Sequence, residues 1–413
     1  MLSPRFVVSS GSASLSAASI LPGVGAFYAD TSGKVLTVSS AGAPSYASAQ
    51  LPDGVQSRGP AGVMTGDVEA TLFMSSLDGD AYALWASGAS AGTLRWSTAA
   101  IDGDSALSND QPLGAALYAA PLVSRPLSRV FVSTRNAAAA RNRIFALNAT
   151  TGACVWVLNG TCAGATGVLN IGQISAVPIL DSTNYRLLFS NAQLSGGDTV
   201  WAIDARDSPL ASRVLWSKNL GSSDSSLTFT NTSRDTVLVG TNAGRIYKLD
   251  AASGAACWGA TADGCPGTAT GAEQLLCTAS NVNARATSCT GGSAIQKSIM
   301  PVNGVFLGNF VFSTADGYVR MVHVNGTQAW RTLVTGASPP LPIPDVGGGK
   351  VYVGGSDGLV HELSLVHGTE TGTRSVGGGS VVAGAPAYDG SGAPASLHLN
   401  TSQGYQYAFS VPF

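Results

Sequence analysis

The fold is decided by two stretches, RIFALNATTGACVW at residues 143–156 and RIYKLDAASGAACW at residues 245–258. Each begins with apolar residues at alternate positions, passes through a polar turn that contains glycine, and ends on a tryptophan. Alternation with a period of two is typical of a β-strand with one buried face, and glycine with small polar residues is typical of a hairpin turn. Each stretch therefore predicts two antiparallel strands joined by a tight turn.

The first half of this pattern recurs along the whole chain, with a further strand before each occurrence and often a short proline-containing segment before that. Four strands per unit, repeated eight times, predict an all-β fold, an eight-bladed β-propeller of four-stranded antiparallel blades, with seven blades as the alternative. The recurring segments are SGKVLTV from residue 32, DGDAYAL from 78, RNRIFAL from 141, GDTVWAI from 197, AGRIYKL from 243, DGYVRMV from 316, DGLVHEL from 357 and QGYQYAF from 403.

The two ends of the chain complement each other. Few residues follow YQYAF at 405–409, so the eighth unit lacks a fourth strand, whereas RFVVSS at 5–10 is a strand without a unit. We expect the N-terminal strand to complete the last blade and close the ring, which removes an exposed sheet edge. Residues 1–413 are then one propeller domain, with a disulfide-stapled insertion at about 259–297.

The repeated units resemble those of quinoprotein (PQQ)-like β-propellers, the fold of pyrroloquinoline-quinone-dependent alcohol dehydrogenases and of non-catalytic bacterial relatives. The resemblance spans most of the chain. It implies that the tryptophan that ends the outer strand docks against the neighbouring blade. The matching residues here are Trp96, Trp156, Trp216, Trp258 and Trp330.

The sequence departs from the catalytic members of that family. They hold the quinone over a disulfide between adjacent cysteines, and no two cysteines here are adjacent. The four histidines show no metal-ligand spacing, and we expect each to be a solvated or edge side chain. We therefore predict no catalytic residue and no cofactor.

Two weaker sites are predicted in loops. IDGDSALSND at 101–110 places Asp102, Asp104 and Asp110 at the first, third and ninth positions of a loop that could hold calcium, although Ala106 stands where a further oxygen ligand is expected. The alternative is a solvated loop between blades.

TRNAAAARNR at 134–143 brings Arg135, Arg141 and Arg143 onto one enlarged hairpin, a candidate partner-binding edge for an anionic group. The alternative is a charged hairpin that only keeps the protein in solution.

The six cysteines fall into three close pairs, which predicts the disulfides Cys154–Cys162, Cys257–Cys265 and Cys277–Cys289. Metal binding and thioredoxin-like chemistry are disfavoured because no CxxC is present. Disulfides indicate an oxidising location, extracellular, cell-surface or periplasmic. The start of the chain does not have the pattern of a signal peptide, so either a leader was removed before residue 1 or none exists; the paired cysteines favour the first.

Five N-x-[ST] triplets are also present, which would be glycosylation acceptors in a eukaryote, although chance supplies nearly as many in so Ser- and Thr-rich a chain. They begin at Asn148, Asn159, Asn231, Asn325 and Asn400.

Composition limits the partners. Charged residues make up 11% of the chain and the formal net charge is −2, which disfavours nucleic acid, and no apolar run is long enough to span a membrane. We expect a non-catalytic, secreted or surface-exposed scaffold that binds another extracellular protein or a polysaccharide. A divergent PQQ-dependent dehydrogenase is the first alternative, and a self-assembling subunit of an extracellular fibre or surface layer is the second.

Overall fold

A computed structural model describes most of the chain, and its strands form eight antiparallel sheets of four strands each. This confirms the all-β class and the eight-bladed content, so the seven-bladed alternative is wrong. The described residues are 4–13, 17–39, 49–51, 62–65, 69–98, 113, 116–138, 141–162, 168–193, 196–257, 275–277, 292–302, 308–323, 326–334, 341–377, 382, 384–390 and 394–413.

The chain divides into two compact units, residues 1–177 with 376–413 and residues 178–375, and each holds four sheets. In the first unit, the first sheet is β2 (Ser19–Leu21), β3 (Gly25–Ala29), β4 (Lys34–Val38) and β5 (Ala49–Gln50); the second is β6 (Gly62–Met64), β7 (Thr71–Ser75), β8 (Ala81–Trp85) and β9 (Leu94–Ser97); the third is β10 (Leu122–Ser124), β11 (Arg129–Ser133), β12 (Ile144–Asn148) and β13 (Cys154–Leu158); the eighth is β30 (Ala387–Asp389), β31 (Ser396–Asn400), β32 (Tyr405–Ser410) and β1 (Phe6–Ser9).

The second unit contains the remaining sheets and the four-residue helix α1 (Leu210–Arg213). The fourth sheet is β14 (Ile179–Asp181), β15 (Arg186–Ser190), β16 (Val200–Asp204) and β17 (Val214–Lys218); the fifth is β18 (Thr228–Phe229), β19 (Thr236–Gly240), β20 (Arg245–Asp250) and β21 (Leu275–Cys277); the sixth is β22 (Met300–Val302), β23 (Asn309–Ser313), β24 (Tyr318–His323) and β25 (Gln328–Leu333); the seventh is β26 (Ile343–Asp345), β27 (Lys350–Gly354), β28 (Leu359–Ser364) and β29 (Glu370–Ser375).

One polar side chain after the second strand shapes the next turn in several sheets. In the first sheet the Asp30 carboxylate accepts the backbone N–H groups of Ser32 and Lys34, at 2.9 and 3.0 Å. In the eighth, the Thr401 hydroxyl accepts the N–H of Tyr405 at 3.0 Å. Such side chains replace a backbone partner in the turn, which explains the small polar residues that mark each repeat.

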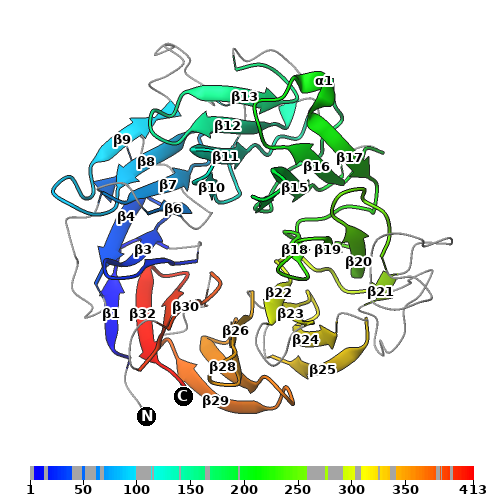
Figure 1. Ribbon diagram of the computed structural model, residues 1–413. Helices are drawn as coiled ribbons and strands as arrows, with labels where there is room; N and C mark the ends of the chain where they lie inside the picture. Colours follow the sequence, from blue (N-terminus) through cyan, green and yellow to red (C-terminus); the bar gives the residue numbers. More distant parts are fainter. Residues whose placement is uncertain are drawn as a thin grey trace. The chain divides into compact units, whose positions relative to one another are not determined.

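The predicted closure by the N-terminal strand is confirmed. Strand β1 pairs antiparallel with β32, with Phe6 opposite Ala408 and Ser9 opposite Tyr405. The two strands lie side by side in Figure 1, blue beside red. The eighth sheet therefore takes its outer strand from the other end of the chain.

Tryptophans on the outer strands join neighbouring sheets. The indole N–H of Trp96 donates to the carbonyl of Ala149 at 3.0 Å, that of Trp216 to Ala251 at 3.1 Å, and that of Trp330 to Leu365 at 2.9 Å. At the matching position of the third sheet, Trp156 is 6% exposed and lies 5.7 Å from the ring of Phe131 in the same sheet. Trp258 lies outside the described residues.

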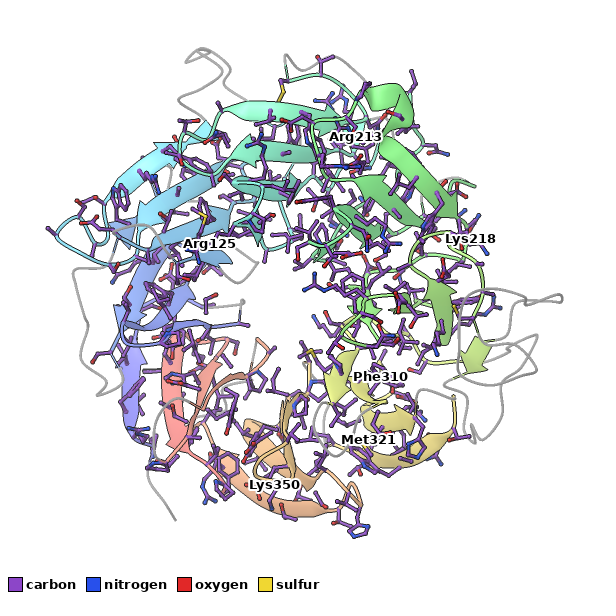
Figure 2. The ribbon with its side chains drawn as sticks, in the orientation of Figure 1. Arg125, Arg213, Lys218, Phe310, Met321 and Lys350 are labelled. Atoms are coloured by element: carbon purple, nitrogen blue, oxygen red, sulfur yellow. A yellow bond between two sulfur atoms is a disulfide. The ribbon has the colours of Figure 1, made fainter. Side chains whose placement is uncertain are left out.

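The receiving surface for Trp330 is a turn glycine of the seventh sheet. A Cβ on Gly368 would lie 2.6 Å from carbons of the indole, and Gly368 has a φ of +69°. Glycine is therefore required twice at this position, for the left-handed backbone and for the close approach of the ring. Met321, labelled in Figure 2, lies opposite Trp330 in the register of the sixth sheet.

The fifth sheet corrects one expectation. Its fourth strand is not the segment that ends on Trp258 but β21, which lies inside the expected insertion at 259–297. Leu249 pairs with Ala256 in an isolated bridge, at the position where Leu147 pairs with Cys154 in the third sheet. Strand β21 pairs with Arg245–Tyr247 of β20. Part of the expected insertion therefore belongs to the fifth sheet, as its fourth strand.

Candidate interaction surface on the third sheet

The enlarged hairpin of the third sheet, residues 134–143, is held by side chains as well as by its backbone. The Thr134 N–H donates to the Arg143 carbonyl at 3.0 Å, and the Thr134 hydroxyl accepts the Arg143 N–H at 2.8 Å. The Asn142 carboxamide, which is 0% exposed, accepts from the Asn136 N–H at 2.6 Å and donates to its carbonyl at 2.9 Å. The base of the hairpin is therefore fixed.

The loop that follows β13 lies against this hairpin. Asn142 donates to the carbonyl of Ile171 at 3.1 Å, and Asn159 donates to the carbonyl of Asn142 at 2.9 Å. The Asn159 oxygen in turn accepts the N–H of Leu169 at 2.7 Å. Asn159 has a φ of +69°, a left-handed conformation that asparagine adopts more readily than most residues. The two asparagines thus connect hairpin and loop into one surface.

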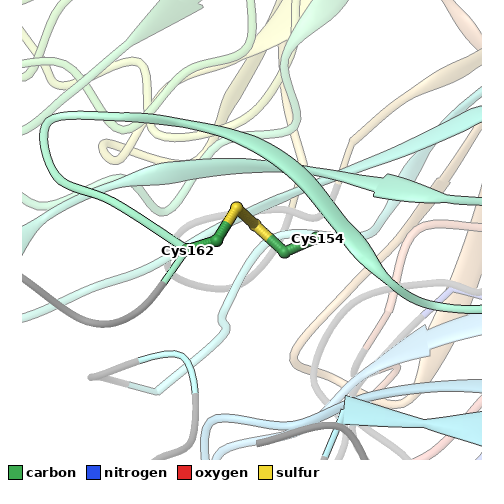
Figure 3. Close-up of a disulfide and its surroundings, with 2 residues drawn as sticks. All are labelled: Cys154 and Cys162. Atoms are coloured by element: carbon green, nitrogen blue, oxygen red, sulfur yellow. A yellow bond between two sulfur atoms is a disulfide. The ribbon is translucent and has the colours of Figure 1, made fainter.

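The same loop is tied to the outer strand by a disulfide. The predicted bond between Cys154 and Cys162 is confirmed, with Cα atoms 5.8 Å apart (Figure 3). It joins the first residue of β13 to the loop after its last residue. Cys257 is also disulfide-bonded, but Cys265 and Cys289 lie outside the described residues, so those two pairings stay predictions.

Three side chains present a mixed polar and apolar face on this hairpin–loop surface. The Arg135 guanidinium lies over the ring of Tyr118, 4.5 Å from its centroid. Arg141 is exposed, and Val168 on the neighbouring loop is 95% exposed. Arginine and aromatic side chains are enriched at protein interfaces, and an exposed aliphatic side chain supplies apolar area to bury.

The third predicted arginine does not share this surface. Arg143 is 6% exposed. Burial, and secondarily the charge of Arg141, lowers its pKa. The structure thus leaves Arg135 and Arg141 on the hairpin surface and buries Arg143, which lies directly before β12 and is bonded to Thr134 at the base of the hairpin.

The expectation of solvated histidines is wrong for two of the four. His361 is 3% exposed, with Nδ1 2.7 Å from the carboxylate of Glu370 and Nε2 3.3 Å from that of Asp357. His398 is 4% exposed and lies between Tyr28 and Ser396, at 3.0 Å from each hydroxyl. Each lies within a strand and is buried; both ring nitrogens of His398 have hydrogen-bond partners, whereas His361 is hydrogen-bonded through Nδ1.

The predicted calcium loop, with Asp102, Asp104 and Asp110, lies outside the described residues. Across the residues that the structure does describe, no group of three or more His, Cys, Asp or Glu side chains could hold a metal ion. In the same part of the chain, no helix has the length and apolarity that a membrane crossing requires.

Sequence reasoning missed a group of ion pairs at the turns of the fourth sheet. The Asp204 carboxylate accepts two bonds from the Arg206 guanidinium, at 3.0 and 2.9 Å, and one from the Ser208 hydroxyl at 2.6 Å. Burial alone would raise the pKa of Asp204, but these bonds outweigh it and lower the pKa to about 2. The alternation IDARDS at 203–208 was the available signal.

The sheets, their register and the docking tryptophans define the class of protein, an eight-bladed β-propeller. The family model described as the outer membrane protein assembly factor BamB matches residues 129–294 and 196–390, together more than half of the chain. The chain therefore belongs to this family of PQQ-like repeat propellers. No curated protein sequence matches it.

Solved structures agree on the fold. BamB from Moraxella catarrhalis is 16% identical with a TM-score of 0.63, and the match covers 100% of both chains. Sqt1 from Saccharomyces cerevisiae is 11% identical with a TM-score of 0.66, covering 98% of both. The quinohemoprotein alcohol dehydrogenase from Comamonas testosteroni is 12% identical with a TM-score of 0.65, covering 98% of this chain and 76% of that one. At these identities the likeness establishes the fold alone.

Proposed function

We propose that the protein is a non-catalytic scaffold of an oxidising compartment, extracellular, cell-surface or periplasmic, which binds another protein or a glycan. The observation that carries the proposal is the hairpin–loop surface of the third sheet, where Arg135, Arg141 and Val168 are displayed on a base fixed by asparagines and a disulfide. A rigid base reduces the entropy lost on binding, which favours recognition.

Two further observations support this reading. The family model is that of an assembly factor. The two buried histidines, His361 and His398, contact side chains of other strands, Glu370 and Tyr28. We propose that no cofactor is needed, with calcium at Asp102, Asp104 and Asp110 as the alternative to test.

The test compares variants of the full chain for binding. Arg141→Glu with Val168→Asp reverses a charge and removes an apolar contact on the proposed surface, whereas Arg125→Glu changes an exposed arginine in the first turn of the same sheet. Crosslinking in extracts of the source envelope or medium, followed by affinity measurement with the captured partner, should show at least a tenfold loss for the double variant and none for the control. Equal binding by both variants would refute the surface.

The enzyme alternative has its own assay. Quinone and calcium are added to the purified chain, and dye-linked alcohol oxidation is followed. We expect no activity above that of free quinone, and turnover that requires the folded protein would overturn the scaffold proposal. Electron microscopy at high concentration tests for fibres, the second alternative.

A further inference from the structure

The structure separates the N-x-[ST] triplets that the sequence could not distinguish. Two of them begin with enclosed asparagines. Asn159 is 1% exposed, and its Nδ2, the atom that would carry a sugar, donates to the carbonyl of Asn142 at 2.9 Å. Asn400 is also 1% exposed and lies within β31, opposite Gln406. A saccharide on either nitrogen would have to displace packed neighbours, so the native fold excludes it.

Two others are less informative. Asn325 lies outside the described residues. Asn148 is half-buried at the end of β12, and its oxygen accepts the N–H groups of Thr150 and Thr151 at 2.9 and 3.1 Å. The adjacent carbonyl of Ala149 receives Trp96, so Asn148 stands next to a contact between sheets.

Asn231 differs from all of these. It lies in the turn between β18 and β19, and Asn231, Thr232 and Ser233 are all exposed. Its Oδ1 accepts the N–H of Asp235 at 3.2 Å, and its backbone carbonyl accepts the N–H of Arg234 at 3.3 Å. Because the oxygen faces the turn, the Nδ2 of the same carboxamide points away from that bond, toward solvent.

The neighbourhood of Asn231 can accommodate a bulky group. The turn connects two strands of one sheet, and the Arg234 side chain reaches away to the Ser182 hydroxyl at 2.6 Å. The hydroxyl of Ser233, the third position of the triplet, also lies on the surface, bonded to the Asp235 carboxylate. Surface turns of this kind are where N-linked glycans are found.

We propose that Asn231 is an N-linked glycan acceptor. This proposal rests on one part of the proposed function, the oxidising compartment, because glycan transfer takes place where disulfides form. It does not depend on partner binding by the third sheet. In the transfer, Nδ2 of Asn231 attacks the anomeric carbon of an oligosaccharide carried on a lipid pyrophosphate. The new N–C bond forms as the C–O bond to pyrophosphate breaks, the lipid pyrophosphate leaves, and the amide loses one proton to a base of the transferase.

The experiment expresses the full chain behind a cleavable leader in the secretory pathway of a eukaryotic cell. Secreted protein that melts cooperatively is digested, deglycosylated enzymatically in 18O water and read by peptide mass spectrometry. We expect the label at Asn231 and not at Asn159 or Asn400. Folded protein without a glycan at Asn231, or with one at Asn159 or Asn400, would overturn the proposal.

Matched variants separate the triplet from the turn. Asn231→Gln and Ser233→Ala should each abolish the label at position 231, whereas Thr232→Ala changes only the middle position and should retain it. Loss of the label in Thr232→Ala to the level of Ser233→Ala would show that turn geometry, not the triplet, governs transfer, and would count against the assignment. Binding through Arg141 and Val168 should be the same in all three variants.

Discussion

Two junctions between neighbouring sheets use the same register but different chemistry. Between the sixth and seventh sheets, Trp330 packs on Gly368 and donates to the Leu365 carbonyl. Between the eighth and first sheets, Phe6 takes the register position of Trp330, opposite Ala408. The ring of Phe6 lies 5.8 Å from the ring of His398.

The second junction adds a hydrogen bond that can titrate. The Tyr28 hydroxyl of the first sheet is 3.0 Å from Nδ1 of His398 in the eighth. Phenylalanine has no N–H to donate, so the polar link between sheets passes to this buried pair. At these two junctions the same register position holds an aromatic ring, while the hydrogen bond between the sheets is made by different residues.

The largest effect should come from removing the tryptophan. Trp330→Ala deletes a ring that is 7% exposed and its bond to Leu365, so we expect a loss of about 4 kcal/mol in the free energy of unfolding. Guanidinium titration measures it. Trp85→Ala, at a half-buried ring that lies under the Arg95 guanidinium of its own sheet, is the control and should lose less than half as much. Equal losses of unfolding free energy in the two variants would show that docking between sheets gives Trp330 no additional stabilising role.

Acid should weaken the other junction. Burial lowers the pKa of His398 to about 4, with Asp389 opposing and Arg5 adding to the shift. The unfolded histidine has a pKa near 6.5, so the unfolded chain binds the proton more readily between these values. The free energy of unfolding should fall by roughly 3 kcal/mol as the pH is lowered from about 6.5 to about 4.

Thermal melting across this range tests the assignment. His398→Gln should flatten the dependence, and His367→Gln, at an exposed histidine, should leave it unchanged. An unaltered slope in His398→Gln would place the acid sensitivity elsewhere.

Phe6→Ala should cost about 1 to 2 kcal/mol, less than Trp330→Ala, because Phe6 is only half-buried and makes no hydrogen bond with its side chain. Val7→Ala on the same strand, at a side chain that is 46% exposed, should be nearly neutral. A loss in Phe6→Ala as large as that in Trp330→Ala, again by guanidinium titration, would make the two junctions energetically alike.

The smallest expected effect is a gain. Phe6→Trp restores the indole N–H. Counted from the turn glycine, the residue of the first sheet that corresponds to Leu365 is Ser40, which lies outside the described residues. A new bond there should stabilise the protein by up to about 1 kcal/mol. Destabilisation by more than this amount would show that the first sheet has no room for the larger ring.

Much of the fold was predictable because it is repeated. Eight copies of one turn-and-strand pattern give the sheets, and the lone strand at 5–10 gives the closure. Where a repeat lacks the outer-strand tryptophan, the residues that replace its contacts were not predictable. In the seventh sheet, Glu362 takes the register of Met321 and Gly372 that of Trp330. The Glu362 carboxylate instead lies 2.6 Å from the ammonium of Lys350, which Figure 2 labels.

The candidate surface was predictable in part. Arg135, Arg141 and Arg143 were recognised by their place on a long hairpin, but strand alternation could not show which would be buried, since the length of the turn hides the register. Val168 carried no signal because its exposure depends on Asn142 and Asn159, whose bonds connect segments distant in the chain.

The pairing of β1 with β32 has a consequence for the timing of folding. Phe6 is synthesised about 400 residues before its partner Ala408. At roughly 5 to 20 residues per second, that interval is about 20 to 80 s. Throughout it, β1 is an unpaired strand and the first sheet lacks the ring of Phe6, so the nascent chain exposes a pairing edge that only its last residues cover.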